Sequence, residues 1–179
     1  LIFAVMMLDL IAQYLVHVLL HKVKFMWRFH MVHHSDTAVD VTTGTRHHPG
    51  DFIIRELFAL IAILIFGMPI AFYLIYRILT VFFTYLTHAN MELPIWIDKA
   101  ISAVFISPNI HKFHHHFVRP WTDTNFGNIF SIWDRLFGTF VYSDPHKIQY
   151  GLDVTDADKS DELEYQLKLP FNKNIKMDY

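Results

Sequence analysis

The chain of 179 residues contains no cysteine, which excludes disulfides, thiolate zinc sites and iron–sulfur clusters. Charged residues make up only 18% of the sequence and the formal net charge is -2, which excludes a broadly basic surface for nucleic acid. The remainder is rich in hydrophobic residues (53%) and aromatic residues (16%), more apolar than most soluble domains of this length. We therefore expect a membrane protein in which any metal is held by His, Asp, Glu or water.

Two apolar regions predict the membrane-embedded part. Residues 1–20 form an almost unbroken apolar run, long enough as a helix to cross roughly 30 Å of hydrocarbon. Residues 52–87 form a second block, which Gly67 and Pro69 divide into the two arms of a helical hairpin. We predict an all-α fold, an integral membrane helical bundle with a cytosolic histidine-rich helical cap that carries a dinuclear metal site. The alternatives are a buried core helix at 1–20 and a partly submerged hairpin.

The other segments suggest how the chain is organised. Residues 22–51 are basic and rich in histidine, and this positive charge favours the cytosolic side. Residues 142–179 are polar and charged, so we expect a soluble cytosolic tail, within a single domain covering residues 1–179. The sequence begins without Met, a basic leader or a cleavage motif, and we expect an upstream membrane segment to be missing.

Thirteen histidines are the most informative residues of the chain. Most of them recur at offsets of three and four, which place side chains on one face of a helix. Three groups have this spacing, namely His17 and His21; His30, His33 and His34; and His111, His114 and His115. A hairpin over residues 52–87 would return His88 to the same end of the bundle.

Imidazole is the commonest metal ligand because its neutral form offers a lone pair near physiological pH. One such group alone would be as typical of a solvated helix face, but three in an apolar chain predict a metal site. Nine histidines exceed the about four to six positions around one ion, so we expect two ions. The sequence lacks the Glu-x-x-His pairs of ferritin-like bundles and the HExxH motif of zinc hydrolases.

Taken together, these motifs resemble the fatty acid hydroxylase and sterol desaturase superfamily. "HVLLH", "HMVHH" and "HKFHH" match its three histidine boxes in order, and "NFGNIFSIWDRLFGTF" follows them at 125–140. The resemblance covers nearly the whole chain, since it also includes "TRHHPGD" at 45–51, "THAN" at 87–90 and "YGL" at 150–152. The segments 30–35 and 133–139 are also similar to alkylglycerol monooxygenase, a branch of this superfamily that cleaves ether lipids.

The resemblance implies a membrane-bound non-haem di-iron oxygenase that hydroxylates a lipid-like substrate, such as a sterol, a fatty acyl chain or an ether lipid. It implies two Fe ions, O₂ as co-substrate and an external electron donor, either cytochrome b5-like or ferredoxin-like with its reductase. The expected location is the bacterial inner membrane or the endoplasmic reticulum, with the active site on the cytosolic side. The implied metal ligands are His17, His21, His30, His33, His34, His88, His111, His114 and His115.

Metal-bound imidazole usually donates its other N–H to a carboxylate or carbonyl. Our candidates for that supporting role are Asp9, Asn125 and Asp134, with Arg46 as a fourth. Asp9 interrupts an apolar run, so it should face the bundle interior. The alternatives are a helix-start or ion-pair role for Asp134 and a turn role for Asn125.

Four further histidines lie in less informative contexts, and two of them, His47 and His48, fall in a loop before Pro49. His48 falls in an R-x-H-P-x-acid pattern in which the superfamily more often has glutamate than the Asp51 found here, and we favour a structural role for it. His116 lies just outside the third box and is expected to be a neighbour of the metal ligands, while His146 is expected on the surface.

Other functions remain open at this stage. A desaturase would use the same centre, although we favour hydroxylation. A non-catalytic membrane metal-binding or transport protein would need polar residues through the middle of its spans, where this chain is mostly apolar. A zinc-dependent membrane hydrolase is disfavoured because no glutamate lies between the paired histidines.

Overall fold

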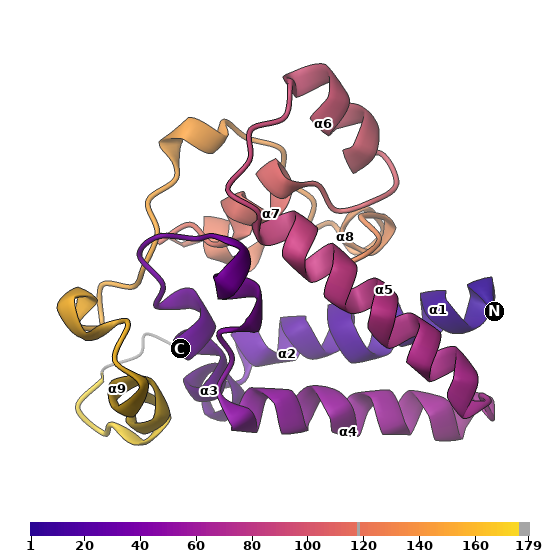
Figure 1. Ribbon diagram of the computed structural model, residues 1–179, viewed down its shortest axis with the longest axis horizontal. Helices are drawn as coiled ribbons and strands as arrows, with labels where there is room; N and C mark the ends of the chain where they lie inside the picture. Colours follow the sequence, from indigo (N-terminus) through magenta and orange to yellow (C-terminus); the bar gives the residue numbers. More distant parts are fainter. Residues whose placement is uncertain (118, 176–179) are drawn as a thin grey trace.

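A computed structural model describes residues 1–117 and 119–175, and this part of the chain is helical without a β-strand. The N-terminal helical run consists of α1 (Ile2–Leu8), a π-helix (Asp9–Leu15) and α2 (Val16–Lys22), followed by α3 (Lys24–His34). Two long helices, α4 (Pro49–Phe66) and α5 (Ile70–His88), form the hairpin (Figure 1). The predicted all-α class is confirmed, and helices are found at 1–20 and 52–87 as expected.

The hairpin turns at the predicted glycine and proline. Gly67 ends α4 in the left-handed region, with φ of 58°, a conformation that costs glycine little because it has no Cβ. Pro69 precedes α5 as its N-cap. At the other end of α4, the backbone N–H of Gly50 donates to Nδ1 of His48 at 2.9 Å. This cap is consistent with a structural role for His48.

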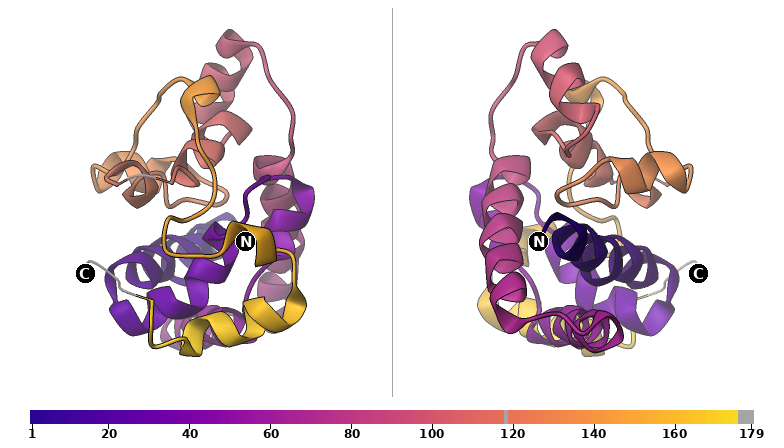
Figure 2. Two further views of the ribbon diagram at one scale, coloured as in Figure 1. Left: turned by 90° about the vertical axis from the view of Figure 1, so that its left-hand side faces the viewer. Right: turned by 90° about the vertical axis from the view of Figure 1, so that its right-hand side faces the viewer.

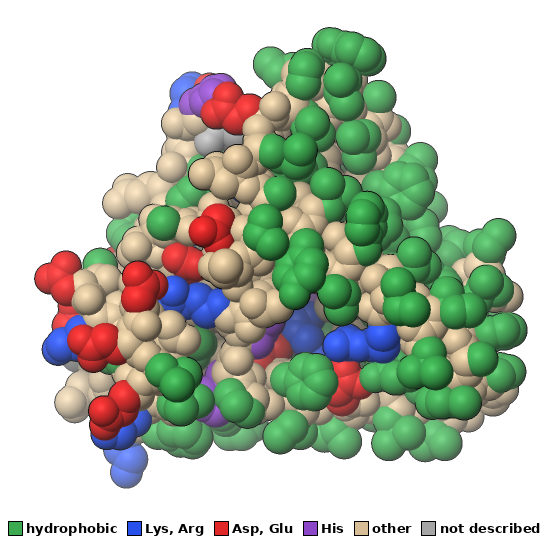
Figure 3. Space-filling view, in the orientation of Figure 1, with side chains coloured by type: hydrophobic (Ala, Val, Ile, Leu, Met, Phe, Trp, Pro, Cys, Tyr) green, Lys and Arg blue, Asp and Glu red, His purple; other side chains and the backbone are tan. Residues whose placement is uncertain are grey.

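Two helical runs, Ile2–Lys22 and Ile70–His88, are long and apolar enough to cross a membrane. The outward sides of α4 and α5 expose many large hydrophobic side chains, including Leu64 at 71% and Ile78 at 71%. Figure 3 shows that this hydrophobic surface extends over α5 and the N-terminal end of the molecule. A hydrophobic surface this extensive is unusual for a protein that meets only water.

Three short helices cover one end of the layer formed by α1 to α5. They are α6 (Ile95–Ser102), α7 (Pro108–His114) and α8 (Ile132–Leu136), and both views of Figure 2 show this segment above the layer that contains α4. Phe126 and Trp133 pack with Tyr14 in a buried cluster. The upper segment is thereby held against the π-helix.

The segment 142–175 is not only a solvated tail. It contains α9 (Leu163–Lys168) and short 3₁₀ turns, and Leu169 and Ile175 are buried in a cluster with Trp27 and Met31 of α3. The sequence analysis missed this contact because polar and charged residues dominate the segment, so its few apolar residues did not indicate a buried face. The rest of that segment is mostly exposed.

Candidate metal centre

All nine predicted ligands lie together at the end of the helical layer. They come from α2, α3, the last residue of α5, and α7 with the residue that follows it. Each histidine side chain is buried, with exposed fractions between 0% and 5%. Three parts of the chain that are distant in sequence, α2 with α3, the end of α5, and α7, therefore enclose one imidazole-rich interior.

The ring nitrogens divide into two sets that could each hold a cation. In each set the potential ligand atoms lie within 4.8 Å of one another. The five-histidine group comprises His17, His21, His30, His34 and His114, and the four-histidine group comprises His33, His88, His111 and His115. The rings of His34 and His115 stack at 4.6 Å, which places the two groups side by side.

Helical spacing explains how the second and third histidine boxes are divided between the two groups. In the second box His30 and His34, at i and i+4, belong to one group, while His33 belongs to the other. The third box is divided in the same way but with the groups exchanged, because His111 and His115 share one group and His114 joins the other. Residues at i and i+4 overlie each other more closely than a residue at i+3, so the second and third boxes each supply both sets, whereas His17 and His21 of the first box share one group.

Contacts at Nδ1 orient six of the rings, five of them through hydrogen bonds and His21 through an ion-pair contact. Four of these atoms lie on backbone carbonyls, namely His17 on Phe126 (2.7 Å), His33 on Thr43 (3.0 Å), His88 on Thr84 (2.7 Å) and His114 on Thr124 (2.6 Å). The other two face carboxylates, with His30 on Asp51 at 2.6 Å and His21 at 3.3 Å from Asp123. A carbonyl or carboxylate only accepts, so these Nδ1 atoms carry the proton and each Nε2 keeps its lone pair.

The arrangement of the Nε2 atoms fits a bound cation. Nε2 of His17 lies 3.0 Å from that of His30, and Nε2 of His88 lies 3.0 Å from that of His111 and 3.1 Å from that of His115. Facing lone pairs at these distances repel unless a positive centre lies between them. In the five-histidine group the buried Nε2 atoms of His21, His34 and His114 have no hydrogen-bond partner, which is costly without a ligand. A metal ion in each group would resolve both problems.

Some of the ligand rings belong to segments outside the membrane-spanning helices. Burial favours their neutral form, which is the form that binds a metal. It lowers the pKa of His30 to about 3, although Asp51 acts in the opposite direction. Burial likewise holds the pKa values of His34, His114 and His115 well below the usual value, with neighbouring histidines adding to the effect. These imidazoles therefore need not lose a proton to a metal at neutral pH.

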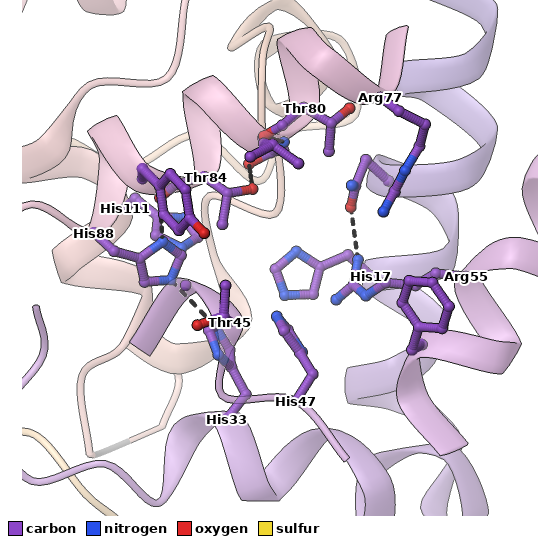
Figure 4. Close-up of a pocket in the computed structure, with 17 residues that line it drawn as sticks. His17, His33, Thr45, His47, Arg55, Arg77, Thr80, Thr84, His88 and His111 are labelled. Atoms are coloured by element: carbon purple, nitrogen blue, oxygen red, sulfur yellow. Dashed lines mark hydrogen bonds between the residues drawn. The ribbon is translucent and has the colours of Figure 1, made fainter. Parts of the chain in front are cut away.

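A cavity of about 330 Å³ adjoins the metal centre. His33, His88 and His111 of the four-histidine group line it, whereas His17 does so from the five-histidine group. Figure 4 shows His88 and His111 on one side of this space and the guanidinium groups of Arg55 and Arg77 on the other. A group bound in the cavity would thus meet three members of the four-histidine group and only His17 of the other.

The residues predicted to support the ligands have other partners. Asp9 accepts from the backbone N–H groups of Ile129 and Phe130 and from Nε1 of Trp133. Asp134 accepts from the backbone N–H groups of Phe126 and Gly127. The prediction that these two carboxylates contact a ligand imidazole is wrong, because both instead satisfy the buried backbone of the 126–130 segment.

Asn125 and Arg46 also bind elsewhere. Asn125 has a positive φ of 54°, and its amide group donates to the carbonyls of Ile110 and Val141, as expected of the alternative turn role. Arg46 donates to Asp161 at 3.0 Å and to the carbonyl of Ser160. Neither residue takes the predicted supporting role, but each fixes a loop near the centre.

The supporting residues that the sequence analysis missed are Asp51 and Asp123. Asp51 already stood in the R-x-H-P-x-acid pattern, and its place in the first turn of α4 was the available signal. Asp51 also accepts from Nε of Arg55 at 2.7 Å and lies 3.3 Å from Nδ1 of His47. His47 stacks on His33, with ring centroids 4.3 Å apart. No local pattern marked Asp123.

Comparisons with known proteins identify the class to which this centre belongs. A buried, helix-borne set of histidines beside apolar spans is the arrangement expected from the three boxes. The family model described as "Fatty acid hydroxylase" matches residues 1–139. The chain belongs to this family.

Two kinds of curated relatives are similar to the chain. The ornithine lipid hydroxylase OlsE of Rhizobium tropici is 30% identical over 89% of this chain and 47% of its own length. Alkylglycerol monooxygenase is 29% identical in Caenorhabditis elegans, over 71% of this chain and 24% of the relative, and 26% identical in Homo sapiens, over 78% and 30%. The chain thus spans less than half the length of these relatives. No solved structure matches it significantly.

Proposed function

We propose that this protein is a membrane-bound non-haem di-iron oxygenase that hydroxylates a lipid-like substrate. The observation that carries the proposal is the pair of buried histidine groups, one of which lines a cavity between apolar helices. Family membership and the similarity to a lipid hydroxylase and to alkylglycerol monooxygenases support the same chemistry.

The proposed reaction inserts one oxygen atom into a C–H bond. One O₂, two electrons and two protons convert the C–H group into C–OH and one water. Iron would supply the oxidising power, since no amino-acid side chain can attack an unactivated C–H bond. The electrons would come from an external cytochrome b5-like or ferredoxin-like donor with its reductase.

The chain's own residues orient the ligands and shape the site. Asp51 keeps the proton of His30 on Nδ1, so that Nε2 of His30 points inward as a ligand. The carbonyls of Thr43 and Thr84 do the same for His33 and His88. Phe52 and Val81 line the cavity and would keep water from the reacting carbon.

The proposed orientation places the metal centre near the cytosolic boundary of the bacterial inner membrane or the endoplasmic reticulum. The N-terminal helical run and α5 would cross the hydrocarbon layer with α4 beside them, because their hydrophobic side chains are exposed on the molecular surface. A lipid could then enter the cavity sideways without first being transferred through water.

Metal analysis combined with oxygen uptake tests the proposal. The purified protein, supplied with membrane lipids, a reductase and a ferredoxin or cytochrome b5, should contain about two irons per chain. It should consume O₂ only with lipid present and transfer ¹⁸O from ¹⁸O₂ into a lipid hydroxyl group. The exposed His146 provides a matched control, since His146→Ala should leave these properties unchanged. One zinc per chain without lipid-dependent oxygen use would refute the proposal.

A further inference from the structure

A charged cluster lies in the hairpin beside the cavity, on the side away from His88 and His111 (Figure 4). Arg77 is the only Asp, Glu, Lys or Arg residue of α5. Figure 3 shows basic and acidic side chains within an otherwise hydrophobic surface between α4 and α5. Ionisable residues inside a membrane helix are costly and usually serve a function.

The partners of Arg77 leave much of its guanidinium available. Nη1 lies 3.2 Å from Oε1 of Glu56, and the guanidinium carbon lies 5.8 Å from the ring centroid of Phe52. Glu56 is shared, because its other oxygen accepts from the hydroxyl of Tyr73. Arginine has five N–H donors, and the described contacts of Arg77 use few of them.

The guanidinium of Arg55, unlike that of Arg77, already donates hydrogen bonds to two side chains. Its Nε donates to Asp51 at 2.7 Å and its Nη1 donates to Gln13 at 2.7 Å. Both arginines line the cavity. Arg55 therefore supports the metal centre through Asp51, whereas Arg77 can bind an incoming group.

The ion pair with Glu56 does not by itself explain why Arg77 is there. A buried ion pair is often no more stabilising than apolar residues of similar size, and the hairpin already has apolar residues on most positions. The side chains of Arg77 and Glu56 are 31% and 26% exposed. An anionic group arriving from the bilayer between α4 and α5 could therefore reach the guanidinium.

We infer that Arg77 binds a carboxylate or phosphate oxygen of an anionic lipid and so positions the lipid chain in the cavity toward the four-histidine group. Guanidinium matches both oxyanions through paired N–H donors, and the low dielectric of the hairpin strengthens the attraction. Arg77 and His88 are eleven positions apart on α5, roughly 16 Å along the axis. The bound anionic group is thus well separated from the carbon to be oxidised. This inference relies on the proposed function for the oxidation step, but not for the binding itself.

Binding to the detergent-purified full chain, measured without O₂ or reductant, tests the inference. The probes are palmitate, hexadecyl phosphate and hexadecanol, which have equal chain length, with inorganic phosphate as a free anion. Wild type should bind at least one of the two anionic amphiphiles about ten- to hundredfold more tightly than hexadecanol. Excess inorganic phosphate should not displace it, because the apolar chain supplies the rest of the affinity.

Variants separate direct binding from a structural effect. Arg77→Gln should abolish the preference for the anionic amphiphile, while Arg77→Lys, which keeps the charge but loses the paired N–H donors, should retain only part of it. Glu56→Gln breaks the same ion pair but leaves the cation, so it should retain the preference or increase it. Metal content and size-exclusion profile are measured for each variant to verify folding. Equal affinity of wild type for all three amphiphiles, or loss of the preference in Glu56→Gln as in Arg77→Gln, would overturn the inference.

The binding assay is independent of the proposed function. An Arg77-dependent preference in a protein that never consumes O₂ would support the binding site and refute the oxygenase. Lipid-dependent O₂ consumption that is indifferent to charge and to Arg77→Gln would support the oxygenase and refute the binding site.

Discussion

The two histidine groups differ in what supports their rings and in what they face. In the five-histidine group two Nδ1 atoms face carboxylates, Asp51 and Asp123. In the four-histidine group the acceptors found for Nδ1 are the backbone carbonyls of Thr43 and Thr84, and Nδ1 of His111, like Nδ1 of His21 in the other group, has no hydrogen-bond partner. Three of its four members line the cavity.

This difference suggests a division of roles between the two proposed ions. A carboxylate on the far side of an imidazole makes it a stronger ligand and fixes its orientation. The five-histidine group should therefore retain its ion more tightly. The four-histidine group, open to the cavity, should exchange its ion more readily and provide the position where substrate and O₂ meet.

The largest predicted effect comes from removing one ligand from each group. His34→Ala and His115→Ala delete stacked neighbours of similar burial, and each should lower activity by more than about a hundredfold, beyond the effect typical of a supporting residue. His115→Ala should retain about one metal ion per chain, because the five-histidine group is intact. His34→Ala should retain less metal per chain than His115→Ala. Metal analysis with oxygen uptake measures both, and equal or reversed retention would contradict the division of roles.

A smaller effect is expected from the carboxylates. Asp51→Asn and Asp123→Asn keep the side-chain size but remove the charge that faces His30 and His21, so each should weaken the tighter metal site about ten- to hundredfold. Competition with a chelator measures this, and the ion of the four-histidine group should leave at an unchanged rate. Glu164→Gln is the control, because this exposed residue pairs only with Lys168. If the more slowly released ion left both Asp variants at an unchanged rate, the supporting roles of Asp51 and Asp123 would be contradicted.

The sequence predicted which histidines meet but not how they divide. Offsets of three and four residues are visible in one chain, so the membership of each box and its shared helix face could be predicted. The division between two groups depends on which helix faces which, and this is set by long-range packing of α2, α3 and α7. Four of the five acceptors that hydrogen-bond Nδ1 atoms are backbone carbonyls, which no residue type reveals.

The carboxylates were the harder part of the prediction for a related reason. Asp9 and Asp134 looked suitable because buried carboxylates near histidines often support metal ligands. A buried carboxylate needs hydrogen-bond donors of any kind, and the backbone N–H groups of the 126–130 segment supply them to both residues. Asp51 instead meets His30 across the contact between α3 and α4, a juxtaposition created by the fold.

The smallest predicted effect concerns the segment that orients two members of the five-histidine group. The carbonyls of Phe126 and Thr124 hold His17 and His114, and Asp134 accepts from the backbone N–H of Phe126. Among the described residues, the Nδ1 hydrogen bonds of the four-histidine group go to Thr43 and Thr84 and not to this segment. A substitution at Asp134 should therefore affect the five-histidine group.

Burial raises the pKa of Asp134 to about 6, because it outweighs the hydrogen bonds that favour the carboxylate. The folded protein thus keeps this proton in a pH range where the unfolded chain has released it, so the free energy of unfolding falls as pH rises between the two pKa values, by at most about 3 kcal/mol. Asp134→Asn cannot ionise and lacks this loss. The stability of the variant relative to wild type should therefore increase from about pH 4 to about pH 7, as measured by thermal unfolding at matched metal content. A difference that stays constant or decreases over this range would show that the carboxyl is not strained by its burial, and that the 126–134 segment supports His17 and His114 without an electrostatic cost.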